Sequence, residues 1–385
     1  MSIMLNKLLE WNKKNGDTGY DPYDVVSLNK FTRGLQKDFW ELSFFKKIVR
    51  VCLEKTALIS PKTLRKFLRI KKKEHPTHLG CMLHTYVNLQ ARGESDYSSE
   101  IELYRTKLIE QRSSFSEEYC WGVPFAWESG GVEFEEGTPF AVVANWIGIA
   151  FLELYKLNGK KEDLEIAISA CEFVLKDLPR TSKEGRVCFS YSPLKKDTIN
   201  NANLFAADLL IRVGDECDKA EYLEIGKRAV DFSIDTQLES GLIPYYAEGG
   251  NTFNDSYHSS YEMQCIYRAW KITGEDRFKI SFDKYWEYYL TNYYHSDGTI
   301  SKYSMKKYPV DSTSLADALI LFAEIREDVN VKDYADAVLE NLRLNWQSKE
   351  GYFYYKEKKR NSMVNIPYIR WTQGWMALGL SYWDE

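Results

Sequence analysis

Four glycines in the C-terminal two thirds of the chain recur at nearly constant spacing. Gly185, Gly241, Gly298 and Gly351 follow one another at intervals of 56, 57 and 53 residues. Each glycine follows an acidic or polar residue, and each precedes a strand-like run rich in aromatic residues. Self-similarity at a nearly fixed period is the signature of a repeat architecture. The chain is therefore predicted to use one supersecondary unit several times.

Each unit contains two helical patterns of different polarity. The first helix is apolar on nearly every side and the second carries a single apolar stripe; an all-apolar helix is buried, whereas a striped one faces solvent. The first helices are therefore predicted to form an inner ring and the second an outer ring. The predicted inner helices are 77–92, 140–157, 203–213, 259–272, 314–325 and 371–383, and the outer ones include 97–112, 161–178, 219–238, 276–293 and 331–346.

The last predicted inner helix has no following partner, so an N-terminal helix is expected to supply it and close the ring. The predicted fold class is all-α, an (α/α)6 toroid of helical hairpins with short β-hairpins or loops at one rim. Residues 1–385 are predicted to form a single domain, with the N-terminal helices (residues 1–75) packing on or closing the ring. A hydrophobic content of 44% is sufficient for one large core.

Composition excludes several classes of function. A net charge of -5 gives no indication of a nucleic-acid partner. The seven cysteines form no C-x-x-C pair, which is typical of reduced cysteines in a cytoplasmic protein. Zinc, iron–sulfur and nucleotide-binding motifs are missing, so neither a metal nor a cofactor is expected. The N-terminal segment lacks the apolar run of a signal peptide, and no stretch is long and apolar enough to predict a membrane span.

One segment is strongly basic. Seven lysines and arginines lie between Lys62 and Lys73, interleaved with Leu64, Phe67, Leu68 and Ile70. An ordinary solvated helix face is the favoured interpretation, and an anionic membrane surface or an acidic partner in an assembly complex is the alternative. The predicted location is therefore the cytoplasm, with a peripheral position at the inner membrane as an alternative.

The loops before the inner helices should share one rim, to which the helix N-termini and their positive dipole ends also point. In Asp255-x-x-His258-x-x-x-Glu262, side chains three and four residues apart share a helix face. A carboxylate beside an imidazole orients the ring, so Asp255 and His258 are catalytic candidates for acid–base chemistry. Asp255 also fits the role of a helix N-cap, and the two roles are compatible.

Asp311 occupies the equivalent position one repeat later, and it is the third catalytic candidate. The VDSTS sequence around it is also a strong capping signal. Glycoside hydrolysis needs two carboxylates that flank the scissile bond, about 6.5–9.5 Å apart for inversion. Asp255 as the acid, with Asp311 or a glutamate from residues 133–136 as the base, would meet this need.

Aromatic and polar residues near the same rim are the substrate-binding candidates. Tyrosine and tryptophan stack on sugars, and amides bind hydroxyl groups without transferring protons. Arg370 with Trp371 suits a carboxylate, a phosphate or a sugar ring, or alternatively a salt bridge that braces a loop. The candidates are Tyr20, Asp21, Trp121, Trp127, Tyr191, Asn201, Asn203, Tyr245, Tyr257, Glu262, Arg370 and Trp371.

Several of these motifs together resemble a known superfamily. They are Gly19-Tyr20-Asp21-Pro22-Tyr23-Asp24, Tyr191-Ser192-Pro193, Asn201-Ala202-Asn203-Leu204, Gly241-Leu242-Ile243-Pro244-Tyr245, Asp255-x-x-His258 and Arg370-Trp371. With them the chain resembles the six-hairpin (α/α)-toroid carbohydrate-active superfamily, and more narrowly the toroid proteins of bacterial capsule and exopolysaccharide gene clusters. The resemblance implies an oligosaccharide, polysaccharide or lipid-linked glycan as partner.

Three functions follow as hypotheses. The first is a glycoside hydrolase-like, glycan-processing protein of bacterial surface polysaccharide biosynthesis, which uses the acidic residues at the central cavity. The second is a uronic acid or sugar epimerase or lyase, with tyrosine and histidine as acid–base groups and Arg370 holding an acid group. A two-histidine version is not expected, because His258 is the single histidine placed at the rim. The third is a non-catalytic glycan-binding scaffold of a polysaccharide assembly complex.

Overall fold

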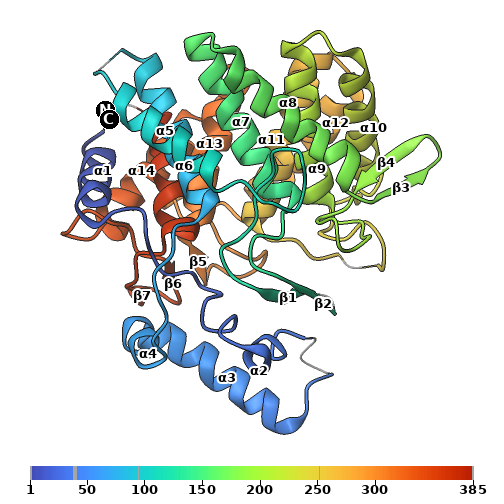
Figure 1. The fold of residues 1–385 in the computed structure, drawn as a ribbon. Coiled ribbons are helices and arrows are strands. Elements are labelled where there is room, and N and C mark those ends of the chain that lie inside the picture. Colours follow the sequence, from blue (N-terminus) through green and yellow to red (C-terminus); the bar gives the residue numbers. More distant parts are fainter. Residues whose placement is uncertain (1, 38–40, 94, 130, 251, 384–385) are drawn as a thin grey trace.

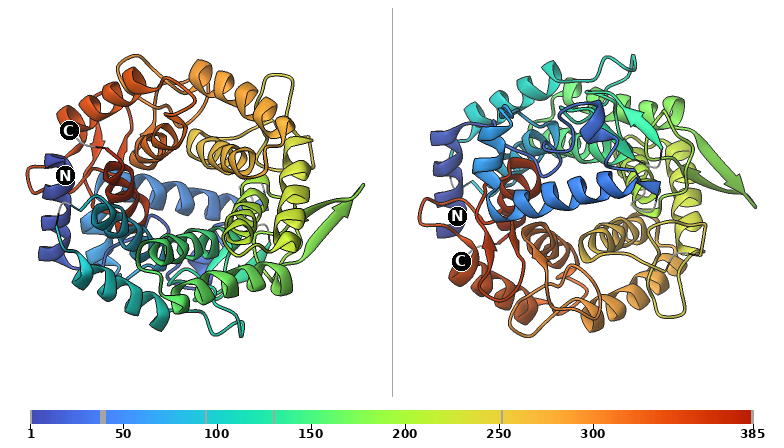
Figure 2. Two further views of the ribbon diagram at one scale, coloured as in Figure 1. Left: turned by 90° about the horizontal axis from the view of Figure 1, so that it is seen from above. Right: turned by 90° about the horizontal axis from the view of Figure 1, so that it is seen from below.

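The chain forms a ring of helices in two layers, as seen from above and below in Figure 2. The structure is a computed structural model, and it describes residues 2–37, 41–93, 95–129, 131–250 and 252–383. No helix in these ranges is both long and apolar enough to cross a bilayer. The N-terminal and C-terminal ends lie next to each other on one side of the ring (Figure 1).

The inner layer consists of six helical segments whose side chains are almost all buried. Every face of these helices meets another part of the protein; apolar side chains fill most of these contacts, and buried, hydrogen-bonded polar side chains such as Asn203 and Glu262 fill others. The inner helices are α5 (Pro76–Ala91), α7 (Ala141–Asn158), α9 (Asn200–Glu216), α11 (Ser256–Thr273), α13 (Ser312–Ile325) and α15 (Trp375–Ser381), which continues the π-helical turn η3 (Ile369–Gly374).

The outer layer consists of striped helices that bury one face against the inner ring. They are α1 (Ile3–Asn15), α6 (Ser98–Glu110), α8 (Lys161–Asp177), α10 (Ala220–Ile234), α12 (Asp276–Asn292) and α14 (Lys332–Asn341), which continues into η2 (Leu342–Trp346). The prediction of an all-α (α/α)6 toroid is confirmed.

The repeated glycines explain how the units dock on one another. Gly241, Gly298 and Gly351 have positive φ angles of 94°, 73° and 106°. A Cβ on any of them would come within 3.0 Å of a backbone carbonyl on an outer helix. These carbonyls belong to Lys284 on α12, Ala337 on α14 and Lys7 on α1. Helix α1 therefore occupies the outer position of the sixth unit, and it also packs on α15.

The connections between the helices contain short antiparallel strands. β1 (Trp127–Ser129) pairs with β2 (Val132–Phe134), β3 (Arg180–Lys183) pairs with β4 (Arg186–Phe189), and β5 (Val310–Asp311), β6 (Lys356–Glu357) and β7 (Met363–Val364) form one sheet. Of the predicted aromatic strands, only the first forms a regular ladder within the described ranges. In the second, Pro244 provides no backbone donor, and the run makes a single bridge between Ile199 and Tyr246.

A further segment lies over one opening of the ring. It contains α2 (Lys30–Arg33), α3 (Phe44–Ile59) and α4 (Pro61–Phe67), and α3 crosses the opening in the view from below (Figure 2). We call residues 17–37 and 41–73 the mouth segment. Arg65 anchors it, since its buried guanidinium donates to Asp24 Oδ2 and to the Asp21 carbonyl, both at 2.9 Å.

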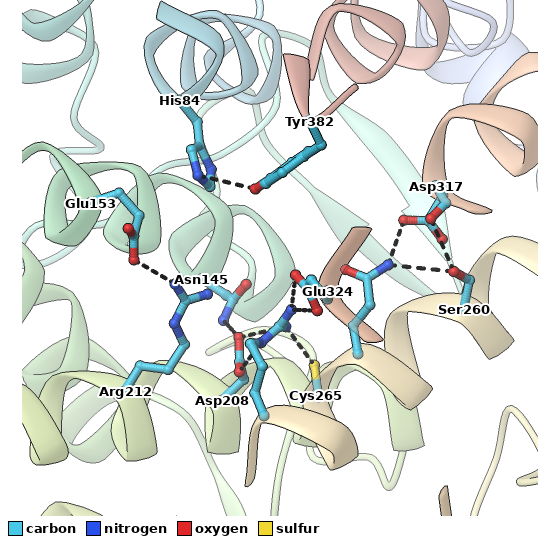
Figure 3. A network of polar contacts seen from close by, with 12 residues as sticks. His84, Asn145, Glu153, Asp208, Arg212, Ser260, Cys265, Asp317, Glu324 and Tyr382 are labelled. Carbon is cyan, nitrogen blue, oxygen red and sulfur yellow. Dashed lines mark hydrogen bonds and ion pairs between the residues drawn. The ribbon is translucent and has the colours of Figure 1, made fainter. Parts of the chain in front are cut away.

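The opposite end of the barrel is filled by a network of charged side chains (Figure 3). Arg268 Nε lies 2.7 Å from Asp208 Oδ1, and its Nη1 lies 2.7 Å from Glu324 Oε1. Arg212 forms a second ion pair with Glu153, also at 2.7 Å. These residues come from the C-terminal halves of four inner helices. The network therefore ties neighbouring hairpins together at the end away from the mouth.

His84 makes this network sensitive to acid. Burial lowers the pKa of His84 from 6.5 to about 4, opposed by Glu153 and reinforced by Arg212 and Arg268. Between pH 6.5 and pH 4 the unfolded chain binds a proton at His84 that the folded chain does not bind. The free energy of unfolding is therefore highest above pH 6.5 and falls as the pH decreases toward 4. When the pH is lowered over this range, the free energy of unfolding measured in urea should fall by about 3 kcal/mol more for the wild type than for His84→Gln. Equal losses in both proteins would contradict the assignment.

Candidate functional site

A cavity opens at the mouth, where the inner helices begin. Its outer chamber has a volume of about 200 Å³ and its inner chamber about 110 Å³. The two chambers share their lining residues Val123, Tyr191, Tyr257, His258, Arg370 and Trp371. We call both chambers together the mouth cavity. Its walls are largely aromatic, which suits the apolar faces of sugar rings.

Asp255 and His258 form a dyad at the start of α11. His258 Nδ1 lies 2.9 Å from Asp255 Oδ1, and the same oxygen accepts the His258 backbone N–H at 3.1 Å. The aspartate therefore caps the helix and orients the imidazole, so both predicted roles occur together. The ring lines both chambers, and Nε2 is the nitrogen left for a ligand.

The Asp255 carboxylate is held in its ionised form. Burial acts to raise its pKa, but the charge and hydrogen bond of His258 and the charge of Lys302 together lower the pKa below the ordinary value. An ionised carboxylate on Nδ1 stabilises a proton that arrives at Nε2. The dyad is therefore arranged as a general base.

Tyrosines surround the His258 ring. Its centroid lies 4.2 Å from that of Tyr257 and 5.0 Å from that of Tyr245. Burial raises the pKa of both phenols well above the usual value. They remain neutral, and as neutral hydroxyl groups they can donate hydrogen bonds to substrate oxygens.

Arg370 lines the cavity but is already paired. Its Nε lies 2.7 Å from Asp21 Oδ2 and its Nη2 lies 2.9 Å from Asp21 Oδ1. The guanidinium also stacks over the rings of Tyr23 and Trp371. Of the two roles considered for Arg370, the structure shows the salt bridge that braces a loop, here across the mouth segment.

Asp311 lies outside the lining of the mouth cavity. Its carboxylate contacts Lys302 Nζ at 2.6 Å and Lys356 Nζ at 3.1 Å, and it is buried. It begins α13, although its side chain makes no capping hydrogen bond. The two lysines neutralise Asp311, so the structure gives no support to its pairing with Asp255 as a catalytic carboxylate.

Three predicted binding residues make hydrogen bonds inside the protein and do not line the mouth cavity. Trp121 is fully buried and donates from Nε1 to the Leu108 carbonyl. Asn203 accepts the Phe189 backbone N–H. Glu262 points to the outer layer, where its Oε2 accepts from the hydroxyl of Tyr285 on α12 at 2.5 Å. Glu262 lies one turn further along α11 than His258, at a level where this side of the helix packs against α12 rather than against the cavity.

Glu262 is also chemically unlike the dyad. Burial raises its pKa well above the usual value, although hydrogen bonds from Tyr285 and Asn254 act in the opposite direction. The group is therefore a neutral acid within the hairpin. Tyr20, another predicted binding residue, stacks on the Arg65 guanidinium beside a small apolar cluster, away from the two chambers.

The remaining predictions meet at the cavity. Trp127, Tyr191, Asn201, Tyr245, Tyr257, His258, Arg370 and Trp371 line one or both chambers. Asn201 Oδ1 is buried, and it has no hydrogen-bond partner among the described residues. A buried acceptor without a partner is costly, so this amide is free to accept a hydrogen bond from a sugar hydroxyl.

His75 was missed by the sequence analysis. It lines the inner chamber together with His258, and it is 2% exposed. Its Nδ1 accepts the Thr77 backbone N–H at 3.2 Å and caps α5, so the neutral ring carries its proton on Nε2. That nitrogen has no partner among the described residues. The signal was the following residue, Pro76, because proline favours the first helical position and so places His75 at the rim.

Asp197 was also missed. It lines the outer chamber, where its Oδ1 accepts the Tyr191 backbone N–H at 2.9 Å. No lysine or arginine in the described ranges lies within ion-pair distance of it. Burial raises its pKa, against the smaller effects of the Tyr191 hydrogen bond and of Lys195.

Comparison with known proteins places the fold among sugar enzymes. No family model and no curated protein sequence matches the chain. The structure is similar to cellobiose 2-epimerase from Bacillus thermoamylovorans (TM-score 0.64, 11% identity, covering 80% of this chain and 87% of that one).

Two further solved structures are similar over comparable lengths. One is a D-mannose isomerase (TM-score 0.59, 14% identity, covering 80% and 86%). The other is the GH76A α-1,6-mannanase from Salegentibacter sp. HEL1_6 (TM-score 0.60, 15% identity, covering 81% and 89%). The chain has the (α/α)6 toroid fold of these carbohydrate-active enzymes.

Proposed function

We propose that the protein is a sugar isomerase or epimerase, which moves a proton at the carbon next to the carbonyl of an open-chain sugar. The observation that carries this proposal is the Asp255–His258 dyad, whose Nε2 faces an aromatic cavity. Asp21 and Asp311, in contrast, are committed to Arg370 and to two lysines. A positioned imidazole is the commonest general base in enzymes.

The proposed chemistry uses the dyad, two tyrosines and, for epimerisation, a second histidine. His258 Nε2 takes the proton from the carbon next to the carbonyl, and the C–H electrons form an enediolate whose charge lies on the former carbonyl oxygen. Asp255 stabilises the imidazolium, while the hydroxyl groups of Tyr245 and Tyr257 donate to the sugar oxygens. Return of the proton to the adjacent carbon, with transfer of the remaining hydroxyl proton from one enediolate oxygen to the other, gives isomerisation. Return to the opposite face of the same carbon gives epimerisation, with His75 as the second acid.

Hydrogen exchange tests the proposal. The protein is incubated in D2O with a panel of aldoses, ketoses, uronic acids and reducing disaccharides, and the products are followed by NMR. We expect deuterium at the carbon next to the carbonyl, together with a new sugar. If neither appears with any member of the panel while the protein binds sugars, the proton-transfer assignment fails.

Glycoside hydrolysis is the second candidate, and Asp197 is the observation that favours it. A buried carboxyl with a raised pKa suits a general acid. Asp255 would then be the second carboxylate. Hydrolysis would release new reducing ends without carbon-bound deuterium, and Asp197→Asn would abolish that release. Sugar binding with neither reaction would favour the glycan-binding scaffold.

We further propose a role in bacterial surface polysaccharide biosynthesis, in the cytoplasm, with an oligosaccharide, polysaccharide or lipid-linked glycan as substrate. The resemblance to proteins of capsule and exopolysaccharide clusters supports this setting, and so does the basic stretch Lys62–Lys73 on the mouth segment. Turnover of a lipid-linked glycan and of its free sugar at the same rate would contradict the lipid-linked form of the proposal.

A further inference from the structure

Three segments on the mouth side share an unusual surface pattern, in which two lysines follow an exposed apolar side chain. The three triplets are Phe45-Lys46-Lys47, Leu194-Lys195-Lys196 and Met305-Lys306-Lys307. Phe45 is 65% exposed, Leu194 45% and Met305 90%. Leu194 and Met305 lie in the loops that lead into the inner helices α9 and α13, and Phe45 lies in the first turn of α3, which crosses the opening (Figure 2).

Helix α3 extends this pattern across the opening. None of its residues is buried, although more than half of its sequence is apolar. Phe44, Ile59 and, on α4, Phe67 are 80%, 72% and 82% exposed. Isolated exposed apolar residues are ordinary, but a group of large ones on one face indicates an interaction surface. We call α3, α4 and the turns at Leu194 and Met305 the docking rim.

Charge is concentrated on the same face. Residues 44–73 contain eleven lysines and arginines and one glutamate, in a chain whose net charge is -5. Arg65 is buried and paired with Asp24, and the other ten cations are at least partly exposed. The acidic β1–β2 hairpin beside it is partly neutralised, because Glu133 pairs with Arg33 and Glu136 with Lys73. The docking rim therefore presents phenylalanines within a positive field.

We propose that the docking rim binds the surface of an anionic lipid bilayer, with Phe44, Phe45 and Phe67 inserted at the level of the headgroups. An exposed amphipathic helix with basic and aromatic residues is the arrangement that binds at this level. A second copy of the chain is disfavoured as the occupant, since two strongly positive faces would repel each other. This inference does not rest on the proposed function.

The geometry adds a consequence for substrate delivery. With the docking rim on a bilayer, the mouth cavity opens toward the headgroups, because α3 crosses the same opening (Figure 2). A glycan held at the membrane by a lipid would then enter directly. Sugar chemistry alone does not require a basic and apolar surface around the mouth. Contact with a bilayer explains this surface.

Vesicle sedimentation with the full chain tests the inference. The probes are vesicles of phosphatidylcholine alone and of phosphatidylcholine with phosphatidylglycerol, about one anionic lipid in three. We expect at least about tenfold stronger binding to the anionic vesicles, and weaker binding in high salt. The triple variant Phe44→Ser, Phe45→Ser, Phe67→Ser should lose about tenfold in partitioning.

A matched control uses exposed apolar residues away from the mouth. Ile280 near the start of α12 and Ile3 at the start of α1 are 57% and 67% exposed. Their double serine variant should bind anionic vesicles like the wild type. Equal loss in control and rim variants, or equal binding to both vesicle types, overturns the inference. So does a dimer, detected by light scattering, that only the rim variant dissociates. Sugar turnover measured separately shows whether the proposed function stands.

Discussion

Replacing His258 by asparagine should lower the rate of sugar turnover by about 10³-fold, the usual contribution of a general base. The ring is the group that receives the proton, whereas the backbone N–H of residue 258, which Asp255 caps, remains in the variant. We expect the fold and the thermal midpoint to be nearly unchanged. The measurement is the rate of deuterium incorporation from D2O under saturating sugar.

Asp255 provides the companion experiment, since its cap and its catalytic contact can be separated. In Asp255→Asn the new amide oxygen can still accept the backbone N–H of His258, but the side chain supplies no charge to the ring. This variant should keep its stability and lose turnover, by less than His258→Asn. Asp255→Ala should lose both. Full turnover in Asp255→Asn would show that the aspartate is only a cap.

Replacing Arg268 by methionine should destabilise the protein by about 3–5 kcal/mol, because removal of one partner leaves buried charges without compensation. Asp208 and Glu324 both depend on this guanidinium, and Asp208 is 2% exposed. Sugar binding at the mouth should survive in the folded fraction, since the network lies at the other end of the barrel (Figure 3). Urea unfolding measures the loss.

Two controls make this result specific. Adding Asp208→Asn and Glu324→Gln to Arg268→Met should recover much of the lost stability, since no uncompensated charge then remains. Arg343→Met removes an exposed arginine beside Glu340, and it should leave the unfolding midpoint close to that of the wild type. A similar loss for both arginine variants would show that burial of the network contributes little.

The ring could be predicted from sequence because its signals are local. Helical polarity is read within one segment, and a glycine with positive φ lies against a neighbouring helix in three of the four units that the repeat marks. The end of the chain was harder, since η3 and α15 follow each other where one helix was expected. The π-helical turn η3 contains Arg370 and Trp371, and nothing in the local pattern indicates it.

The site was only partly predictable, because position along the chain does not fix orientation. The rule that the segments leading into the inner helices share one rim predicted His258, Tyr245 and Tyr257, and all three line the mouth cavity. Glu262 satisfied the same spacing rule but faces the outer layer. Whether a helix face meets the cavity or the next helix depends on how the hairpins pack.

Ion pairs were beyond the reach of sequence for a different reason. Arg370 pairs with Asp21, which lies 349 residues earlier in the chain. Asp311 pairs with Lys302 and Lys356 from two different rim loops. No local pattern joins these charges, so the sequence predicted Asp311 as a catalytic residue and Asp21 and Arg370 as binding residues, and the fold shows the ion pairs in which they take part.

The position of α1 has a consequence for biosynthesis. The Lys7 carbonyl on α1 contacts Gly351 in the way that carbonyls on α12 and α14 contact Gly241 and Gly298. Helix α1 also packs on α15. During translation α1 leaves the ribosome before any of these partners exists. Its contacts with Gly351 and α15 must wait until those segments have been synthesised, although Asn12 can already reach Tyr104 on α6. The helix that comes first among those of the ring therefore completes its docking among the last.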